Sequence, residues 1–284
     1  MSVAIVTDTV ACLLDDLASQ HDIKVIPLQV VHEGKTYLDR IDITPARFYH
    51  LLATSPEMPT TSAPPPETYV EAFQELLAQD KEILVICPSR KLTHVYESAG
   101  IAAGLIQETQ PAASIAVLDS GTAASAQGFV ALDAAVAAQQ GDYLPEVIRT
   151  AENTMKKVHV VVFLDTLDYL VKGGRVPHIL GWANALLKIK PMIELKPLGK
   201  GVVPVDRVRT RPRALERLVR IIREKAGGRP IRIVVQHTNC PEEAVGLEGM
   251  LKAALNCINI HIQDFTPVMG LHTGPGLLGV SYCL

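Results

Sequence analysis

The sequence predicts an α/β protein of two packed α/β domains, the first built on a doubly wound, mostly parallel sheet. Two observations support this fold class. In the first half of the chain, short runs rich in β-branched residues alternate with segments of helical periodicity, which is typical of a parallel sheet covered by helices. The 284 residues also exceed the roughly 100–200 residues that one domain usually contains, so two domains are expected.

Four strands are expected in the first half, because each is a continuous apolar run with little polar alternation, as in a sheet buried on both faces. Their residues are 3–8, 24–31, 82–87 and 114–120. Two helices are expected between them. Thr44 and Pro45 have the residue types that begin a helix, and Tyr69 and Phe73 repeat at helical spacing in the segment 64–79.

The second half is expected to form a second α/β domain, so that the domains are 1–157 and 158–284. Its hairpin turns between Gly199 and Gly201. The expected elements are a strand at 159–164, a hairpin at 193–210, a helix at 212–226, a strand at 231–237, a helix from 241, and strands at 258–265 and 277–283. No low-complexity linker separates the halves, so the domains are expected to pack together with a ligand cleft between them.

Composition and charge exclude several functional classes. The formal net charge is −3 at pH 7, so the chain lacks the basic excess of nucleic-acid-binding proteins. Its five cysteines are scattered without a CxxC pair, which indicates a reducing compartment. Acidic residues interrupt the first apolar segment, and no apolar run reaches the ~18 residues of a membrane span. A cytoplasmic protein without a nucleic-acid partner is expected.

A glycine-rich segment, "GLHTGPGLLG" at 270–279, contains a single histidine. Gly274, Gly276 and Gly279 spell GxGxxG, but a dinucleotide site also needs a following helix and an acidic residue about 20 positions on, which the sequence lacks. Such glycines serve turns or a close backbone approach to a ligand. His272 is either a structural residue bonded to a neighbouring carbonyl or a ligand-binding residue. We favour ligand binding, because its glycine neighbours leave the imidazole uncovered.

Two segments place hydroxyl groups in front of expected helices. Thr61 and Ser62 precede the helix within 64–79, and Ser89 and Thr93 precede another helix. Free N–H groups at a helix start, together with adjacent hydroxyls, can bind an anion such as a carboxylate. Both segments are expected at the carboxyl edge of the sheet, where ligands of open α/β sheets bind. The alternative is that these side chains only cap the helices.

Asp8 and Asp119 end two of the expected strands and could hold a metal or act as acid and base. The sequence has no metal-binding spacing such as HExxH and no GxSxG nucleophile motif. We therefore expect no catalytic residues, no metal and no enzymatic activity. The alternative is a hydrolase of a small anion that uses Asp8, Asp119 and His272.

The segment 206–225 holds eight Lys or Arg residues against three Asp or Glu residues. One interpretation is a solvated helix face with ordinary ion pairs. The other is a surface that contacts an acidic partner or, transiently, a membrane. The residues expected at such a surface are Arg175, Arg207, Arg209 and Arg213.

The order of these motifs resembles the DegV family of bacterial lipid-binding proteins. The matching segments run through nearly the whole chain in the family's order, which is far more specific than any one of them. They are "TDT" at Thr7, "IPLQV" at Ile26, "YLD" at Tyr37, "TSAPP" at Thr61, "SRKLTHVYESA" at Ser89, "LDS" at Leu118, "LDYLVKGGRV" at Leu167, "IKPMIEL" at Ile189 and "HTGPG" at His272. The chain departs from the family at 92–95, where LTHV replaces LSGT, and at Ala63, which replaces a glutamine. His94 either fills space there or adds a donor.

The resemblance implies a non-catalytic carrier of a long-chain fatty acid such as palmitate, without a cofactor. In such proteins the acyl chain lies in an internal tunnel, hydroxyls of the first domain and a late histidine of the second hold the carboxylate, and glycine lets the backbone approach it. The corresponding residues are Thr61, Ser62, Ser89, Thr93, His272 and Gly274. The resemblance also implies a separate kinase as partner, since this chain has no P-loop or kinase motif.

Overall fold

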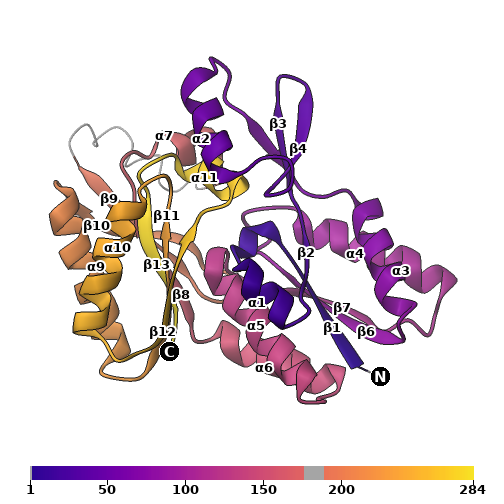
Figure 1. The fold of residues 1–284 in the computed structure, drawn as a ribbon. Helices are drawn as coiled ribbons and strands as arrows, with labels where there is room; N and C mark the ends of the chain where they lie inside the picture. The colour runs from indigo at the N-terminus through magenta and orange to yellow at the C-terminus, as the bar shows by residue number, and fades with distance from the viewer. Residues whose placement is uncertain (1, 176–188) are drawn as a thin grey trace.

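The computed structural model describes residues 2–175 and 189–284 (Figure 1). Within these residues the first half of the chain forms a four-stranded parallel sheet. Its strand order is β2 (Lys24–Ile26), β1 (Ser2–Asp8), β6 (Lys81–Cys87) and β7 (Ile115–Asp119). The apolar runs of the central strands β1 and β6 are buried because helices cover the sheet. The predicted α/β class is confirmed.

Helices cover both faces of this sheet. α3 and α4 pack against β6 and β7, whereas α5 packs against β1 and α6 against β6, and Figure 1 shows the two pairs on opposite sides of the strands. The bounds are η1 (Thr9–Ala11), α1 (Asp15–Gln20), α3 (Pro66–Leu77), α4 (Val95–Thr109), α5 (Ala124–Gln139) and α6 (Leu144–Met155). α5 is rich in alanine and largely buried, because it also packs against β8 and β13 of a second sheet.

The second sheet has six strands and is mostly antiparallel; only β11 and β12 pair in parallel among its described strands. Its strand order is β10 (Gly201–Val208), β9 (Lys190–Lys196), β8 (Val158–Phe163), β13 (Leu278–Cys283), β11 (Ile231–His237) and β12 (Cys257–Asp264). α9 (Arg211–Ala226) and α10 (Pro241–Ala254) pack on this sheet. The predicted hairpin is present, with Gly201 paired to Lys196.

One predicted strand is wrong. The segment 24–31 forms two strands in different sheets, β2 and β3 (Gln29–His32), because Pro27 between them has no N–H for a ladder. β3 pairs with β4 (Lys35–Leu38) and β5 (Thr60–Ser62) in a small antiparallel sheet. α2 (Pro45–Thr54) begins as predicted, with the Thr44 hydroxyl accepting from the N–H of Arg47.

A short helix, α11 (Pro267–Thr273), overlaps the start of the glycine-rich segment, and the sequence did not predict it. It packs against α2, against α7 (Asp168–Lys172) and against β3 and β5 of the small sheet, near the top of Figure 1. The chain then turns at Gly274 and Gly276, both with positive φ, into β13. Among the described helices, none is both long and apolar enough to span a membrane.

Candidate functional site

A cavity of about 140 Å³ lies where the first half of the chain meets the second sheet. Its volume is roughly ten times what one buried water molecule needs. Most of its lining is apolar and comes from both halves of the chain, including Val10, Leu28, Val160, Val162, Ile193 and Leu195. A cavity with such walls favours a hydrocarbon ligand, because polar groups would lose their hydrogen bonds to water there.

Polar side chains from distant segments meet at this cavity. Thr61 and Ser62 come from β5, Thr93 precedes α4, and His272 lies in the last turn of α11. Arg175, which the sequence placed at a partner or membrane surface, also lines the cavity and is exposed to solvent. The structure therefore brings four hydroxyls, counting that of Thr273 in α11, one imidazole and one guanidinium to the same apolar space.

His272 is the best-defined polar group of the site. Its Nε2 lies 3.0 Å from Oγ1 of Thr61, which is 211 positions earlier in the chain. Its Nδ1 is buried and has no hydrogen-bond partner in the described part of the chain. Burial, and then the positive charge of Arg175, lower the pKa of His272 to about 4. The ring is therefore neutral at pH 7.

The glycines near His272 act differently from the sequence-based expectation. They do not leave the ring uncovered: a Cβ added at Gly173 would lie 2.6 Å from Nδ1 of His272, so the ring packs directly on the Gly173 backbone. Gly274 has a φ of +70°, and a Cβ there would overlap the ring of Tyr169. Gly274 is not among the described residues that line the cavity. Its role is to end α11 and to allow close packing.

The hydroxyl segments do not cap the helices that follow them. The N-cap residues of α3 and α4 are Pro65 and His94, and in the described structure neither helix start has a side-chain cap. The alternative of N-capping by the hydroxyls of Thr61, Ser62 and Thr93 is therefore wrong. This leaves the hydroxyls at the cavity without a role in building the helices.

Ser89 and His94 belong to the same motif as Thr93 but do not line the cavity in the described structure. Ser89 is buried, its N–H donates to the Thr122 carbonyl, and its Oγ accepts weakly from Lys91 at 3.4 Å. Neither Ser89 nor His94 is among the described lining residues. The His94 side chain is 91 % exposed, so it neither fills internal space nor adds a donor to the cavity.

The two strand-end carboxylates have structural partners. Asp8 is buried, and it accepts from the N–H of Val10 and from Nε2 of Gln127. Burial raises its pKa to about 7. Asp119 accepts from the N–H of Gly121. Among described residues, the cavity lining includes His272 but neither aspartate, and no cluster of three or more His, Cys, Asp or Glu side chains suits a metal there.

Sequence reasoning did not single out Asp39 as a site residue. This carboxyl group is fully buried, and its Oδ1 lies 3.4 Å from the N–H of Val268 at the start of α11. Burial raises its pKa to about 6. Asp39 thus anchors the helix that carries His272. The "YLD" motif at Tyr37 was the signal, but a motif does not say what the carboxylate contacts.

The basic segment contains both ion-paired and exposed residues. Ion pairs with Asp or Glu are formed by Arg211, Arg217 and Lys225. Arg207, Arg209 and Arg213 are exposed. A surface groove beside α9 is lined by Arg213, Arg217, Arg220 and Arg223, with Asp206 and Glu216 between them. The segment therefore combines ordinary ion pairs with an exposed arginine-rich face.

Comparison with known proteins identifies the family. The model of the family described as "Uncharacterised protein, DegV family" matches residues 2–284. Protein DegV of Bacillus subtilis is 33% identical over 285 residues, which cover 100% of this chain and 99% of the relative. A DegV domain-containing protein of Clostridium acetobutylicum is 34% identical over 287 residues, covering 99% and 98% of the two chains.

Two solved structures match the fold of this protein over the whole chain. "Crystal Structure of DegV, a fatty acid binding protein from Bacillus subtilis" matches with a TM-score of 0.86 and 32% identity, covering 100% of this chain and 99% of that one. "Fatty Acid Binding of a DegV family Protein from Thermus thermophilus" matches with a TM-score of 0.91 and 27% identity, at the same coverage. The sequence and the fold agree, and the chain belongs to the DegV family.

Proposed function

We propose that this protein binds a long-chain fatty acid, such as palmitate, with its carboxylate beside Thr61, Thr93 and His272. The observation that carries the proposal is the His272–Thr61 pair, whose Nε2 and Oγ1 atoms lie 3.0 Å apart in the wall of a mostly apolar cavity. The acyl chain would occupy a tunnel that continues this cavity between the parts 1–157 and 158–284, which we propose as the two domains. The fatty-acid-binding relatives from Bacillus subtilis and Thermus thermophilus support the same ligand class.

The hydrocarbon tail supplies most of the affinity. Burying about 15 methylenes at ~0.8 kcal/mol each contributes on the order of 12 kcal/mol before the costs of association. A buried carboxylate without hydrogen bonds would cancel much of this gain. Hydroxyl donors and the positive charge of Arg175 at the cavity can offset that cost. The polar residues are therefore expected to select the acid over neutral lipids with the same tail.

The neutral state of His272 suggests how the pair serves the ligand. With the proton on Nε2, the imidazole donates to Oγ1 of Thr61, and the Thr61 hydroxyl is free to donate to the carboxylate. The buried Nδ1 is then an acceptor rather than an unpaired donor. His272 thus fixes the direction of the Thr61 hydroxyl.

The test is native mass spectrometry of the protein purified from its expression host. We expect one palmitate or stearate per chain, released by denaturation. A nucleotide in place of the lipid would contradict the proposal. Thr61→Val, which keeps the shape but removes the hydroxyl, is expected to reduce retention of the acid, with Thr109→Val on the exposed end of α4 as a matched control.

We propose further that the protein is a non-catalytic carrier that presents the carboxylate to a separate kinase. The chain has no P-loop motif, so phosphorylation requires another protein. The exposed residues proposed for contact with that partner, or transiently with a membrane, are Arg175, Arg207, Arg209 and Arg213. Incubation of the loaded protein with ATP and Mg²⁺ alone should leave the acid unchanged. Formation of an acyl phosphate without a second protein would refute the carrier role.

A further inference from the structure

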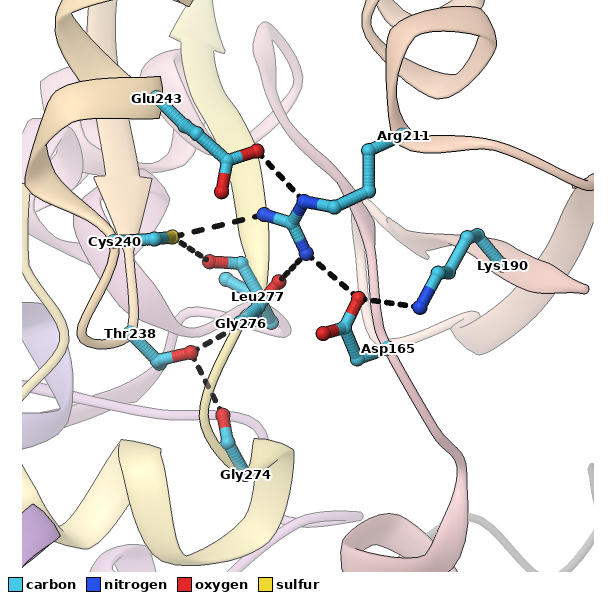
Figure 2. A network of polar contacts seen from close by, with 9 residues as sticks. All are labelled: Asp165, Lys190, Arg211, Thr238, Cys240, Glu243, Gly274, Gly276 and Leu277. Atoms are coloured by element: carbon cyan, nitrogen blue, oxygen red, sulfur yellow. Dashed lines mark hydrogen bonds and ion pairs between the residues drawn. The ribbon is translucent and has the colours of Figure 1, made fainter.

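Arg211, the first residue of α9, connects several segments of the second half of the chain (Figure 2). Its Nη1 donates to Oδ1 of Asp165 at 2.6 Å and to the carbonyl oxygen of Gly276 at 2.8 Å. Its Nε donates to Oε2 of Glu243 at 2.6 Å. The guanidinium carbon also lies 5.2 Å from the centre of the Phe163 ring. Arg211 is therefore engaged on several sides and does not belong to the exposed arginine-rich face.

Two of these contacts lead along the chain to His272 and to the glycine on which its ring packs. Asp165 begins the segment that leads to Gly173, and the ring packs on the Gly173 backbone. Gly276 lies in the turn that directly follows α11 and His272. One nitrogen atom of Arg211, Nη1, therefore binds both segments. A shift of either segment would change the position of the His272 ring.

The turn after His272 is also held from its other side. Oγ1 of Thr238 donates to the carbonyl of Gly274 at 2.7 Å and accepts from the N–H of Leu277 at 2.7 Å, as Figure 2 shows. The N–H of Gly276 donates to the Thr238 carbonyl at 2.8 Å. With Thr238 on one side and Arg211 on the other, the turn has a defined position relative to β11 and α9.

The stability of α9 does not explain this placement. A cation at the first residue of a helix faces the positive end of the helix dipole, which is unfavourable. The acidic partners Asp165 and Glu243 compensate for it. A planar guanidinium can bind acceptors in several directions at once, whereas the ammonium of lysine is a single point charge. The geometry suits a connection between segments.

We propose that Arg211 is a positioning residue that seats His272 for binding the carboxylate, by holding the Asp165 segment and the Gly276 turn at a fixed separation. The inference rests on the fatty-acid function proposed above. Arg211 itself is not among the described residues that line the cavity, so it acts through the two segments.

The test compares Arg211→Gln with Arg217→Gln. Arg217 lies on the same helix and forms an equally short ion pair, Nε to Oδ2 of Asp206 at 2.6 Å, but this pair contacts neither segment. Palmitate and hexadecanol are titrated against both variants and the wild type. In Arg211→Gln we expect palmitate to lose about tenfold in affinity, the value of one hydrogen bond to a charged group, while hexadecanol changes little. In Arg217→Gln neither ligand should change.

A second measurement uses the protein without ligand. The pKa of His272, about 4 in the wild type, is followed by NMR and is expected to shift in Arg211→Gln and to stay constant in Arg217→Gln. An unchanged palmitate-to-hexadecanol ratio with an unchanged pKa would overturn the proposal. An equal loss of affinity for both ligands together with a lower Tm would also overturn it, because that result would mean that Arg211 only stabilises the fold. Arg211→Lys should not restore the ratio, because one ammonium cannot reach all three acceptors.

The two proposals fail in different ways. If the wild type binds no fatty acid, the fatty-acid function fails, and the NMR titration alone decides whether Arg211 positions the ring. If His272→Ala reduces palmitate binding but Arg211→Gln does not, only the positioning role fails. If Arg211→Gln does not fold, Asp165→Asn, which weakens one of the two connections, takes its place in the same comparison.

Discussion

Replacing His272 by alanine tests the head-group site most directly. In the unliganded protein the ring makes one neutral hydrogen bond, from Nε2 to Thr61 Oγ1, which contributes about 1 kcal/mol to folding stability. The ring also buries Nδ1 without a partner among the described residues, at a cost of about 1–3 kcal/mol. These two polar terms offset each other, so we expect the Tm of His272→Ala to fall only by what the packing of the ring on Gly173 contributes.

The effect on ligand binding is expected to be larger. Without the imidazole, the Thr61 hydroxyl loses the group that directs its proton, so the charged carboxylate loses the hydrogen bond that this hydroxyl donates. Such a bond is worth about 1.5–3 kcal/mol, or about ten- to hundredfold in affinity. Hexadecanol and methyl palmitate share the tail but carry no charge, so their affinities should fall less.

The assay is a calorimetric or fluorescence-displacement titration of the three ligands at pH 7, with a melting curve for each protein. His32→Ala is the matched control, because His32 is also buried and its Nε2 lies 2.7 Å from Oγ of Ser55, yet it is not among the described cavity residues. The control should leave the preference for the acid intact. An equal loss across the three ligands in His272→Ala, with a lower Tm, would refute the head-group role and show a structural one.

Three further predictions concern the same site and the basic segment. Because the folded-state pKa of His272 is about 4, below the unfolded value of about 6.5, the contribution of His272 to stability should fall as the pH drops from about 6.5 to about 4. The raised pKa values of Asp8 and Asp39 act in the opposite direction, so this contribution is measured as the difference between wild type and His272→Ala in urea titrations. Gly173→Ala should weaken palmitate binding, since the new Cβ would lie 2.6 Å from His272 Nδ1. The control Gly246→Ala, whose Cβ would have nothing within 4 Å, should leave the palmitate affinity measured by titration unchanged. Charge reversal to Glu at three exposed positions should slow fatty-acid transfer from anionic vesicles at low salt, at about 1 kcal/mol per residue near the surface, without changing binding in solution. These positions are Arg207, Arg209 and Arg213; unchanged transfer would leave them as an ordinary solvated face.

Elements with local signals could be predicted from the amino-acid sequence alone. β1 and β6 are short continuous apolar runs rich in β-branched residues, which favour a strand buried on both faces. α2 begins at Pro45 behind the Thr44 cap, because both residues favour a helix start whatever surrounds them. The ordered motifs were likewise sufficient to point to the DegV family and to the hydroxyl and histidine segments.

Which of these residues come into contact depends on how distant segments pack. Thr61 and His272 are 211 positions apart, and no spacing rule predicts that a small sheet and a short helix bring them within 3.0 Å. Arg175 and Ser89 looked alike as polar residues in family motifs, yet one lines the cavity and the other is buried beside Thr122. Such differences depend on packing between distant segments. The neutral state of the His272 imidazole also depends on the tertiary structure, because burial and the neighbouring Arg175 guanidinium lower its pKa.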